Sequence, residues 1–163
     1  MTTRIELLTE HLQLQPHPEG GFFKETYRSE ELLHSPDIGG SRNLLSSIYF
    51  LLVAENFSSF HCIGSDELWY FQEGAACTIH VLHRQGGYTK IKLGLEISNG
   101  ETLQTWVKAG DWFASETNGE YSLVGCAVAP AFDFKDFEIA NRNKLLLAFP
   151  DFQDLIERLT RDD

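Results

Sequence analysis

Apolar and polar residues alternate through most of the middle of the chain, in short runs separated by glycine, proline and asparagine. A period of two is typical of β-strands, because successive side chains point to opposite faces of a sheet. Many short strands with no helical pattern among them predict a closed antiparallel barrel or a two-sheet roll. The strands predicted in this way are 22–28, 44–53, a hairpin over 59–74, 75–82, 88–95, 102–107, 112–114 and 121–129.

Turn residues predict how some of these strands connect. Asn99-Gly100 is the strongest short hairpin signal in the chain, and it predicts that 95–97 pairs with 102–107 as an antiparallel neighbour. The segment 30–42 is polar and rich in glycine, which predicts a loop that covers the mouth of a cavity. For the strand 22–28 the pattern leaves both faces open as the inner one.

Helical signals occur only near the two ends of the chain. A capping box at 3–6 precedes apolar residues at helical spacing, which predicts a short helix over about 3–13. Asn141 and Pro150 are helix-start signals, and they predict two short helices within about 140–160.

Length and composition suit one compact unit. A chain of 163 residues with 42% hydrophobic residues can build one proper core. No linker, repeat or low-complexity tract divides it. We therefore expect a single domain over 1–163, with its barrel over about 20–130.

The charge and the cysteine content limit the kinds of binding partner and of cellular compartment that we expect. The formal net charge of -11 repels phosphate backbones, and this excludes nucleic acid and anionic membranes as partners. No apolar run reaches the roughly eighteen residues of a membrane helix, and the N-terminus lacks a signal peptide's apolar core. The three cysteines have no metal-ligand spacing and suit a reducing compartment. We expect a cytoplasmic protein whose partner is a small molecule.

The segment 59–74 carries the most informative chemistry. His61 is followed by Glu67 at the start of an aromatic strand. Strand alternation places Glu67, Trp69 and Phe71 on one face. A carboxylate among aromatic rings is costly to desolvate unless a cation, a metal or a hydrogen-bond donor meets it. This spacing therefore predicts a cavity that receives both polar side chains.

The same stretch resembles the first motif of the cupin superfamily, in which two histidines, a glutamate and a glycine build a metal site inside a small β-barrel. His61, Glu67 and Gly74 match the first histidine, the glutamate and the glycine, whereas Ile63 replaces the second histidine. The second motif of the superfamily ends on a histidine and resembles Lys-Ala-Gly-Asp-Trp-Phe, which ends on Phe113 instead.

Further motifs make the resemblance more specific. They lie at 17–22, 27–28, 47–52, 65–69 and 124–134. Together they resemble one branch of short single-domain cupins, whose members mostly carry no assigned function, over about residues 5–150. The resemblance implies an all-β double-stranded β-helix (a cupin jelly-roll barrel) with a ligand-sized cavity, flanked by the N-terminal and two C-terminal helices. It also implies a homodimer.

Three roles are open to His61: metal ligand, general base, or core histidine. Catalytic zinc usually keeps three protein ligands, and neither Ile63 nor Phe113 can ligate a metal. We therefore expect no metal and no other cofactor. A metal that bound all the same would use His61 and Glu67 and recruit a further group such as Gln104, His80 or water.

A catalytic role is the second possibility. A carboxylate that orients a histidine makes the imidazole a competent base near neutral pH. Cupins that epimerise nucleotide sugars use an inward histidine as base with a tyrosine acid opposite. The resemblance therefore suggests His61 as base, Glu67 as its orienting partner and Tyr49 as acid. Core packing explains Tyr49 equally well.

Aromatic and polar residues near the predicted cavity are candidates for ligand contact. Aromatic walls bind sugar faces, yet they also simply fill small barrels. The ligand-binding candidates are Arg28, Trp69, Phe71, Gln104, Trp112, Phe113 and Phe132.

Two functions from different classes follow from these residues. In the first, the protein is an isomerase- or epimerase-type enzyme acting on a small carbohydrate-like metabolite. In the second, the same pocket binds a metabolite without turnover, and the protein is a sensor or a carrier. Nothing in the sequence discriminates between them.

Overall fold

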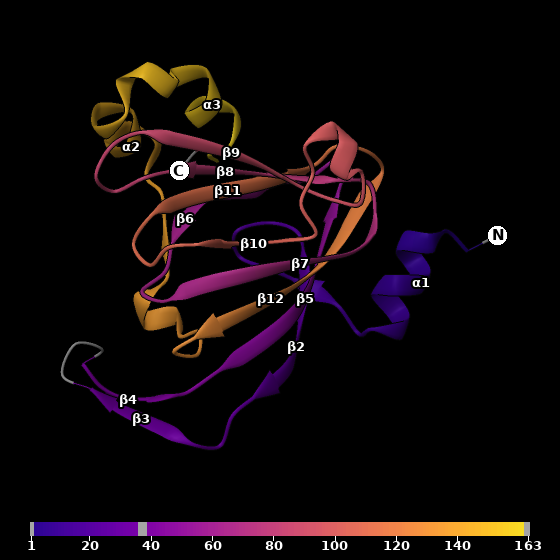
Figure 1. Ribbon diagram of the computed structural model, residues 1–163, viewed down its shortest axis with the longest axis horizontal. Helices are drawn as coiled ribbons and strands as arrows, with labels where there is room; N and C mark the ends of the chain where they lie inside the picture. Colours follow the sequence, from indigo (N-terminus) through magenta and orange to yellow (C-terminus); the bar gives the residue numbers. More distant parts are fainter. Residues whose placement is uncertain (1, 36–38, 162–163) are drawn as a thin grey trace.

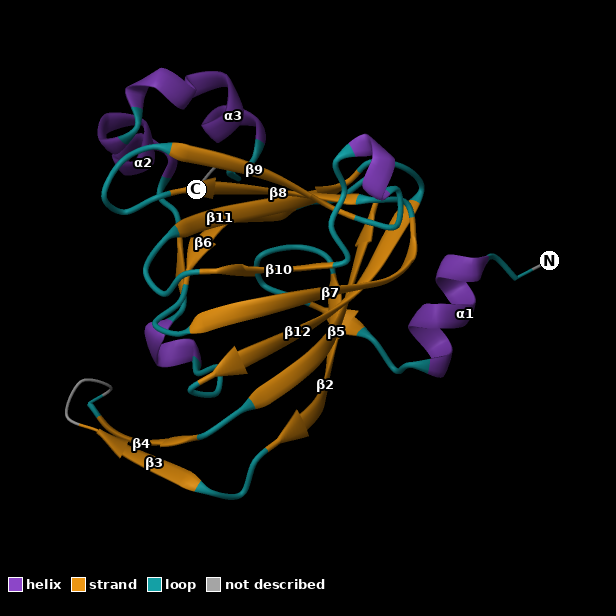
Figure 2. Ribbon diagram, viewed as in Figure 1, coloured by secondary structure: helices purple, strands orange, loops and turns teal. Residues whose placement is uncertain are grey.

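The computed structural model describes residues 2–35 and 39–161 (Figure 1). Two antiparallel sheets face one another, and short helices flank them (Figure 2). The larger sheet has the strand order β1-β2-β5-β12-β7-β10, and the smaller has β13-β6-β11-β8-β9. The predicted all-β jelly-roll fold, with one N-terminal and two C-terminal helices, is confirmed, in the form of a two-sheet roll.

The elements have the following bounds. The strands are β1 Gln15–Pro16, β2 Phe22–Arg28, β3 Leu32–Ser35, β4 Gly40–Asn43, β5 Ser46–Val53, β6 Ser58–Cys62, β7 Asp66–Gly74, β8 Cys77–Leu82, β9 Tyr88–Leu93, β10 Gln104–Val107, β11 Trp112–Thr117, β12 Tyr121–Ala129 and β13 Glu138–Ile139. The α-helices are α1 Arg4–His11, α2 Arg142–Ala148 and α3 Gln153–Arg158, and the short 3₁₀ turns are η2 Ile97–Asn99, η3 Phe134–Asp136 and η4 Pro150–Phe152.

The main core lies between the two sheets. Phe50 and Trp69 come from the larger sheet, and Ile79 and Phe113 come from the smaller one. All four are almost completely buried, and the removal of such apolar surface from water is the main stabilising term of the fold. The inner faces are therefore the alternate positions that the sequence pattern predicts.

The helices cover the outer faces of the sheets (Figure 2). The α1 helix packs Leu8 against Leu51 on the larger sheet, and the capping box at its start is formed. The α2 and α3 helices pack Leu145 and Ile156 against Phe60 on the smaller sheet. Among the described residues, every helix is too short or too polar to cross a membrane.

The segment predicted as a loop over 30–42 contains a hairpin instead. Strands β3 and β4 pair with each other alone and extend from the larger sheet as an arm (Figure 1). Residues 36–38 of this segment lie outside the described residues. The arm pairs Leu32 with Asn43 and Leu33 with Arg42, and both leucines are exposed, so the arm has no apolar face that a period-two pattern could reveal.

The prediction of a hairpin at Asn99-Gly100 is wrong. Residues Ile97–Asn99 form a 3₁₀ turn, and Gly100 ends it with a φ of 77°. Strand β10 pairs with β7, where Gln104 lies opposite Tyr70. An Asn-Gly pair supplies a left-handed residue, and such a residue ends a helical turn as well as it closes a two-residue hairpin.

Candidate functional site

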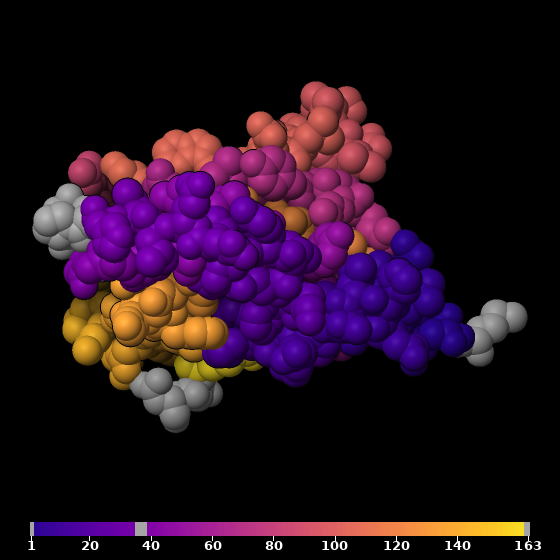
Figure 3. All heavy atoms as spheres, turned by 90° about the horizontal axis from the view of Figure 1, so that it is seen from below, coloured from indigo at the N-terminus to yellow at the C-terminus, as the bar shows by residue number. Residues whose placement is uncertain are grey.

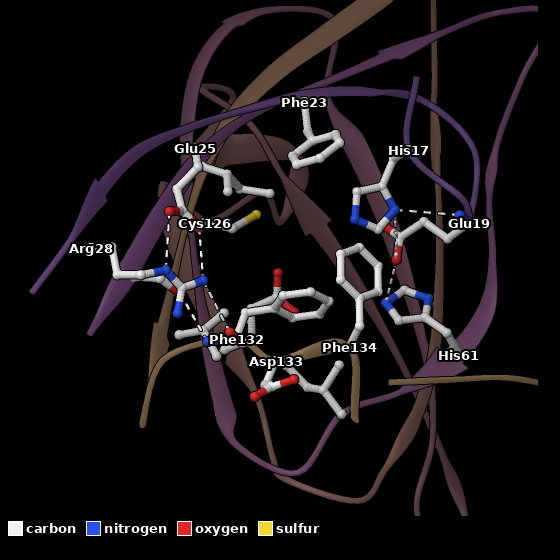
Figure 4. A pocket seen from close by; sticks show the side chains of 15 residues that line it. His17, Glu19, Phe23, Glu25, Arg28, His61, Cys126, Phe132, Asp133 and Phe134 are labelled. Carbon is white, nitrogen blue, oxygen red and sulfur yellow. Dashed lines mark hydrogen bonds and ion pairs between the residues drawn. The ribbon is translucent and has the colours of Figure 1, made fainter. Parts of the chain in front are cut away.

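A cavity of about 260 Å³ opens at one end of the roll (Figure 4). Its walls come from β2, β5, β7 and β12 of the larger sheet, from β6 of the smaller sheet, and from two connecting segments. The first connecting segment contributes His17 and Glu19, and the second contributes Phe132, Asp133 and Phe134.

A bulge in β2 decides which of its side chains face the cavity. Glu25 lies opposite Ile48 of β5, and the register shifts between Glu25 and Tyr27. Arg28 therefore lies opposite Ser46, and all four of these paired residues line the cavity. Without the extra residue, alternation would point Tyr27 inward and Arg28 outward.

His61 and Glu19 form the buried polar centre of the site. The two atoms His61 Nε2 and Glu19 Oε2 lie 2.9 Å apart. His61 Nδ1 lies 2.7 Å from the carbonyl oxygen of Ser59, which can only accept, so Nδ1 carries a proton. Both ring nitrogens of His61 are thus engaged.

The charge state of this pair follows from the contacts. Burial alone would lower the pKa of His61, but the Glu19 carboxylate outweighs burial and the pKa is raised. Burial alone would raise the pKa of Glu19, but the charge and hydrogen bond of His61 leave that pKa lowered. Each partner therefore favours the charged form of the other.

Local backbone geometry holds Glu19 in place. Ser58 Oγ donates to Glu19 Oε1 at 2.9 Å. Gly20 follows with a φ of 110°, and a Cβ at this position would lie 2.0 Å from the carbonyl oxygen of Phe57. Only glycine fits so close an approach of two backbones, so the segment can reach β6 and place its carboxylate beside His61.

His17 lies beside this pair in a different protonation state. The backbone N–H of Glu19 donates to His17 Nδ1 at 3.3 Å, so Nδ1 is unprotonated and Nε2 carries the proton of the neutral ring. Burial lowers the pKa of His17 and keeps the ring neutral. Figure 4 shows this second ring nitrogen turned toward the cavity, with the Phe23 ring at a centroid distance of 4.6 Å. His17 therefore offers one N–H to a ligand.

Glu67 is a further buried carboxyl group of the site. It is the first inward residue of β7 and is only 8% exposed. Burial, together with the negative charge of Glu19, raises the pKa of Glu67 to about 7, while His61 and a hydrogen bond from the Cys126 thiol oppose the rise. Glu67 therefore titrates close to neutral pH, where a group can both give and take a proton.

Arg28 connects two parts of the cavity wall through hydrogen bonds. Its Nε and Nη2 atoms donate to the two carboxylate oxygens of Glu25 at 3.0 and 2.8 Å. Nη2 also donates to the carbonyl oxygen of Phe132 at 3.0 Å, and this contact ties β2 to the segment after β12. Arg28 thus supports the wall of the cavity as well as lining it.

The β3–β4 arm holds the same segment from outside. Arg42 is buried, and its Nη1 atom donates to Asp136 at 2.7 Å and to the carbonyl oxygen of Ala131 at 3.3 Å. The N–H of Ala131 in turn donates to Asn43. Figure 3 shows the purple arm lying beside the orange segment that follows β12.

Four of the residues predicted for the site line the cavity. They are His61, Glu67, Arg28 and Phe132. Glu67 does not orient His61, because Glu19 occupies that position. Phe113 touches the His61 ring at a centroid distance of 4.1 Å but belongs to the core.

The other predicted residues lie elsewhere. Tyr49 points to the opposite face of β5, toward α1, because its neighbours Ile48 and Phe50 face inward. Trp69 and Phe71 continue the inner face of β7 below Glu67 and fill the core. Gln104 is exposed on the edge strand β10, and Trp112 packs under the C-terminal helices.

Several lining residues were not predicted from the sequence. They are His17, Glu19, Phe23, Glu25, Cys126, Asp133 and Phe134. His17 and Glu19 lie within the motif at 17–22 that carries the resemblance, but neither of them is among the predicted site residues. The available signal is a histidine and a carboxylate inside that motif, next to two glycines.

The residues present do not fit a metal ion. Ile63 and Phe113 are apolar at two motif positions, and the Glu19 and His61 donor atoms face each other rather than a common point. No three His, Cys, Asp or Glu side chains converge as a metal site within residues 2–35 and 39–161. We therefore derive no chemistry through a metal at this site.

Comparisons with known proteins agree with this architecture. Residues 6–140 match the sequence model of DUF985, a family within the cupin superfamily. An uncharacterized protein of Saccharomyces cerevisiae is 32% identical over 81% of this chain and 73% of its own length.

Two solved structures are similar over nearly the whole chain. A protein of Shewanella oneidensis is 38% identical over the full length of both chains, with a TM-score of 0.89. A hypothetical protein from Leishmania major is 32% identical over 98% of this chain and all of its own, with a TM-score of 0.91. An oxalate decarboxylase of Bacillus subtilis is only 12% identical, covers 88% of this chain and 36% of its own, and shares the fold with a TM-score of 0.55.

Proposed function

The chain belongs to the DUF985 family of the cupin superfamily, and we propose that it binds a small carbohydrate-like metabolite in the cavity at the end of the roll. One observation carries this proposal. Two histidines and two glutamates, from three separate parts of the chain, line one cavity of about 260 Å³ together with further charged side chains. These four are His17, Glu19, His61 and Glu67.

Size and lining support a small ligand. Ligand pockets for drug-sized molecules have volumes of roughly 300 to 1,000 Å³, and this cavity of about 260 Å³ lies just below that range, so it suits a smaller molecule. Phe23, Phe132 and Phe134 supply apolar rings, which pack against the apolar faces of sugars. His17 Nε2–H supplies a donor for a hydroxyl or carbonyl oxygen.

Binding without turnover is favoured over the mechanism that the sequence suggested. Both nitrogens of His61 are engaged, so its ring has no free lone pair for a proton on a ligand. Tyr49 faces α1 and cannot act as the acid opposite His61. A sensor or carrier needs neither of these groups.

A proton-transfer enzyme of the isomerase or epimerase type is the second candidate, and one observation favours it. Glu67 faces the cavity with a pKa of about 7, which suits a general base. In this reaction Glu67 would abstract a proton from the ligand carbon next to a carbonyl group. His17 Nε2–H would donate to the carbonyl oxygen and stabilise the negative charge that develops on it. Incorporation of deuterium from solvent into a bound sugar would support this candidate.

A ligand screen by nuclear magnetic resonance tests the binding function. The probes are monosaccharides and small hydroxy-carbonyl compounds at about millimolar concentration. We expect at least one to bind, and Ile48→Phe to abolish that binding by filling the cavity. Tyr49→Phe is the matched control on the same strand, because it faces the other way. A probe that binds Ile48→Phe as tightly as the parent, or no binding at all, would reject the proposal.

A further inference from the structure

The charges around the cavity indicate what kind of ligand it accepts. Arg28 is held by both carboxylate oxygens of Glu25, and His61 is held by Glu19. Among the described residues that line the cavity, these two carry the only positive charges. An anionic ligand would find no uncommitted cation there, and burial of its charge would be costly.

The two cations of the cavity are paired with carboxylates, whereas the Glu67 carboxyl is not paired with a cation from the described parts of the chain. It forms no ion pair with any described residue, and only the Cys126 thiol donates to it. Three ionisable groups face it: Glu19 from the 17–21 segment, His61 from β6 and Cys126 from β12. Desolvation and Glu19 both disfavour the ionised form of Glu67. A cation in the cavity would remove that penalty.

Aromatic rings surround the same space (Figure 4). The rings of Phe132 and Phe134 lie 4.9 Å apart between centroids, and the Phe134 ring lies 6.3 Å from that of His17. Phe23 closes the opposite side. The negative face of an aromatic ring attracts an ammonium group within about 6 Å of its centroid. The net charge of -11 also attracts cations to the molecule as a whole.

We propose that the ligand of this cavity carries a positively charged amino or alkylammonium group that pairs with the Glu67 carboxylate, beside a hydroxyl or carbonyl oxygen that accepts from His17. The proposal rests on the binding function proposed above and specifies its ligand class. Amino sugars and small amino alcohols have this combination of groups.

Binding of such a cation is coupled to the ionisation of Glu67. Below a pH of about 7 the carboxyl group must lose a proton before it pairs, so affinity for a permanent cation should rise about tenfold per pH unit and then level off. The pKa of Glu19 is lowered and that of His61 is raised by their mutual contact, so each partner favours the charged form of the other. A neutral ligand that accepts a hydrogen bond from protonated Glu67 would show the opposite trend.

Calorimetric titration with charge-matched probes tests the proposal. Choline is compared with 3,3-dimethylbutan-1-ol, its uncharged isostere, and D-glucosamine is compared with D-glucose. At a pH of about 7 we expect each charged probe to bind at least about tenfold more tightly than its neutral partner. Glu67→Gln should abolish that preference. Glu120→Gln, which removes an exposed carboxylate at the far end of β12, should keep it.

Each other result overturns the inference. If the neutral probes bind as tightly as the charged ones, the amine specificity is rejected while the binding function stands. If Glu67→Gln keeps the preference for the charged probes, Glu67 is not their counter-ion. If neither charged probe binds at about millimolar concentration, this ligand class is excluded, and the wider screen described above decides the binding function separately.

Discussion

His61 Nε2 lies 2.9 Å from Glu19 Oε2, so the histidine of the predicted motif is paired with a carboxylate from outside that motif. The Glu67 carboxyl of the motif is thereby left without an ion-pair partner among the described residues. The Glu19 carboxylate pairs with the imidazole of His61, and the Glu67 carboxyl faces the cavity with a pKa of about 7.

The Glu19–His61 pair should be energetically coupled. Removal of either partner leaves the other buried and unpaired, which typically costs about 3 to 5 kcal/mol. We predict that His61→Ala and Glu19→Ala each lower the free energy of unfolding by about this much, and that the double variant loses much less than the sum. Chemical denaturation of the four proteins gives the coupling energy.

The pH dependence of this coupling has a definite sign. The raised pKa of His61 contributes stability below its unfolded value of 6.5 and loses it as pH rises through the folded value. The lowered pKa of Glu19 contributes above its unfolded value of 4.5 and loses it as pH falls. Coupling should therefore be largest between these two values. Arg4→Ala, in the exposed pair with Glu73, is the control and should change the free energy of unfolding only slightly, because solvent screens that pair.

Glu67 should destabilise the protein above neutral pH. Its pKa is raised from 4.5 to about 7, so the folded state binds the extra proton and stability falls as pH rises between these values. We predict that Glu67→Gln removes this fall and gains about 3 kcal/mol at a pH of about 8 relative to the parent. Thermal unfolding from about pH 5 to 8 measures it. Parallel curves for the two proteins would contradict the assignment.

Gly20 should be irreplaceable, whereas another left-handed glycine should not be. Gly20→Ala places a Cβ 2.0 Å from the carbonyl oxygen of Phe57, on top of the cost of its φ of 110°. Gly86 has a φ of 96°, and nothing lies within 4 Å of a Cβ there. We predict a loss of about 1 kcal/mol for Gly86→Ala and a loss at least about 2 kcal/mol larger for Gly20→Ala. Equal losses in denaturation experiments would show that the close approach relaxes.

Arg42 should control the order of the outer cavity wall. Arg42→Ala removes the contacts to Asp136 and Ala131 and takes a donor away from the carbonyl oxygen of buried Ala131. We predict faster hydrogen exchange over 131–137 in Arg42→Ala, with β7 and β12 unchanged. Arg4→Ala is the control, since Arg4 pairs with Glu73 at the far end of β7, away from residues 131–137. Uniformly faster exchange across the molecule would indicate global destabilisation instead.

A homodimer should form through the outer face of the larger sheet at its β10 edge. Leu68 lies opposite Trp106 there, and together with Tyr70 these side chains are exposed. Exposed apolar edges of this kind favour association. We predict a dimeric mass by light scattering at about micromolar concentration, and a monomer for Trp106→Glu. Leu147→Glu, at an exposed leucine on α2, should remain dimeric.

Sequence pattern was sufficient where a residue's environment depends on its own strand. Glu67 faces inward because β7 alternates without interruption through that end, and Phe132 follows directly after the last long strand. Tyr49 shows the limit of the pattern. Its run is apolar at nearly every position, so composition alone could not say which alternate set faces the cavity.

Contacts between distant segments could not be predicted in this way. Glu19 reaches His61 only because a glycine with positive φ lets two backbones meet, and neither composition nor period encodes that approach. The orientation of Arg28 depends on the bulge near Tyr27, which shifts the phase of one strand relative to its neighbour. Such features arise from pairing between strands and not from the sequence of either one.

The outer wall of the cavity is formed by the segment after β12 and supported by the β3–β4 arm. The β3–β4 arm and the segment after β12 clasp each other through Arg42 and Ala131, and neither lies between the strands of the two main sheets. Insertions or exchanges in these two parts therefore leave the hydrogen-bond ladder of the barrel intact. The inner end, with His17, Glu19 and His61, is bound to the barrel itself. Relatives could thus change which ligand they recognise by altering the β3–β4 arm and the segment after β12 alone, and keep the same polar interior.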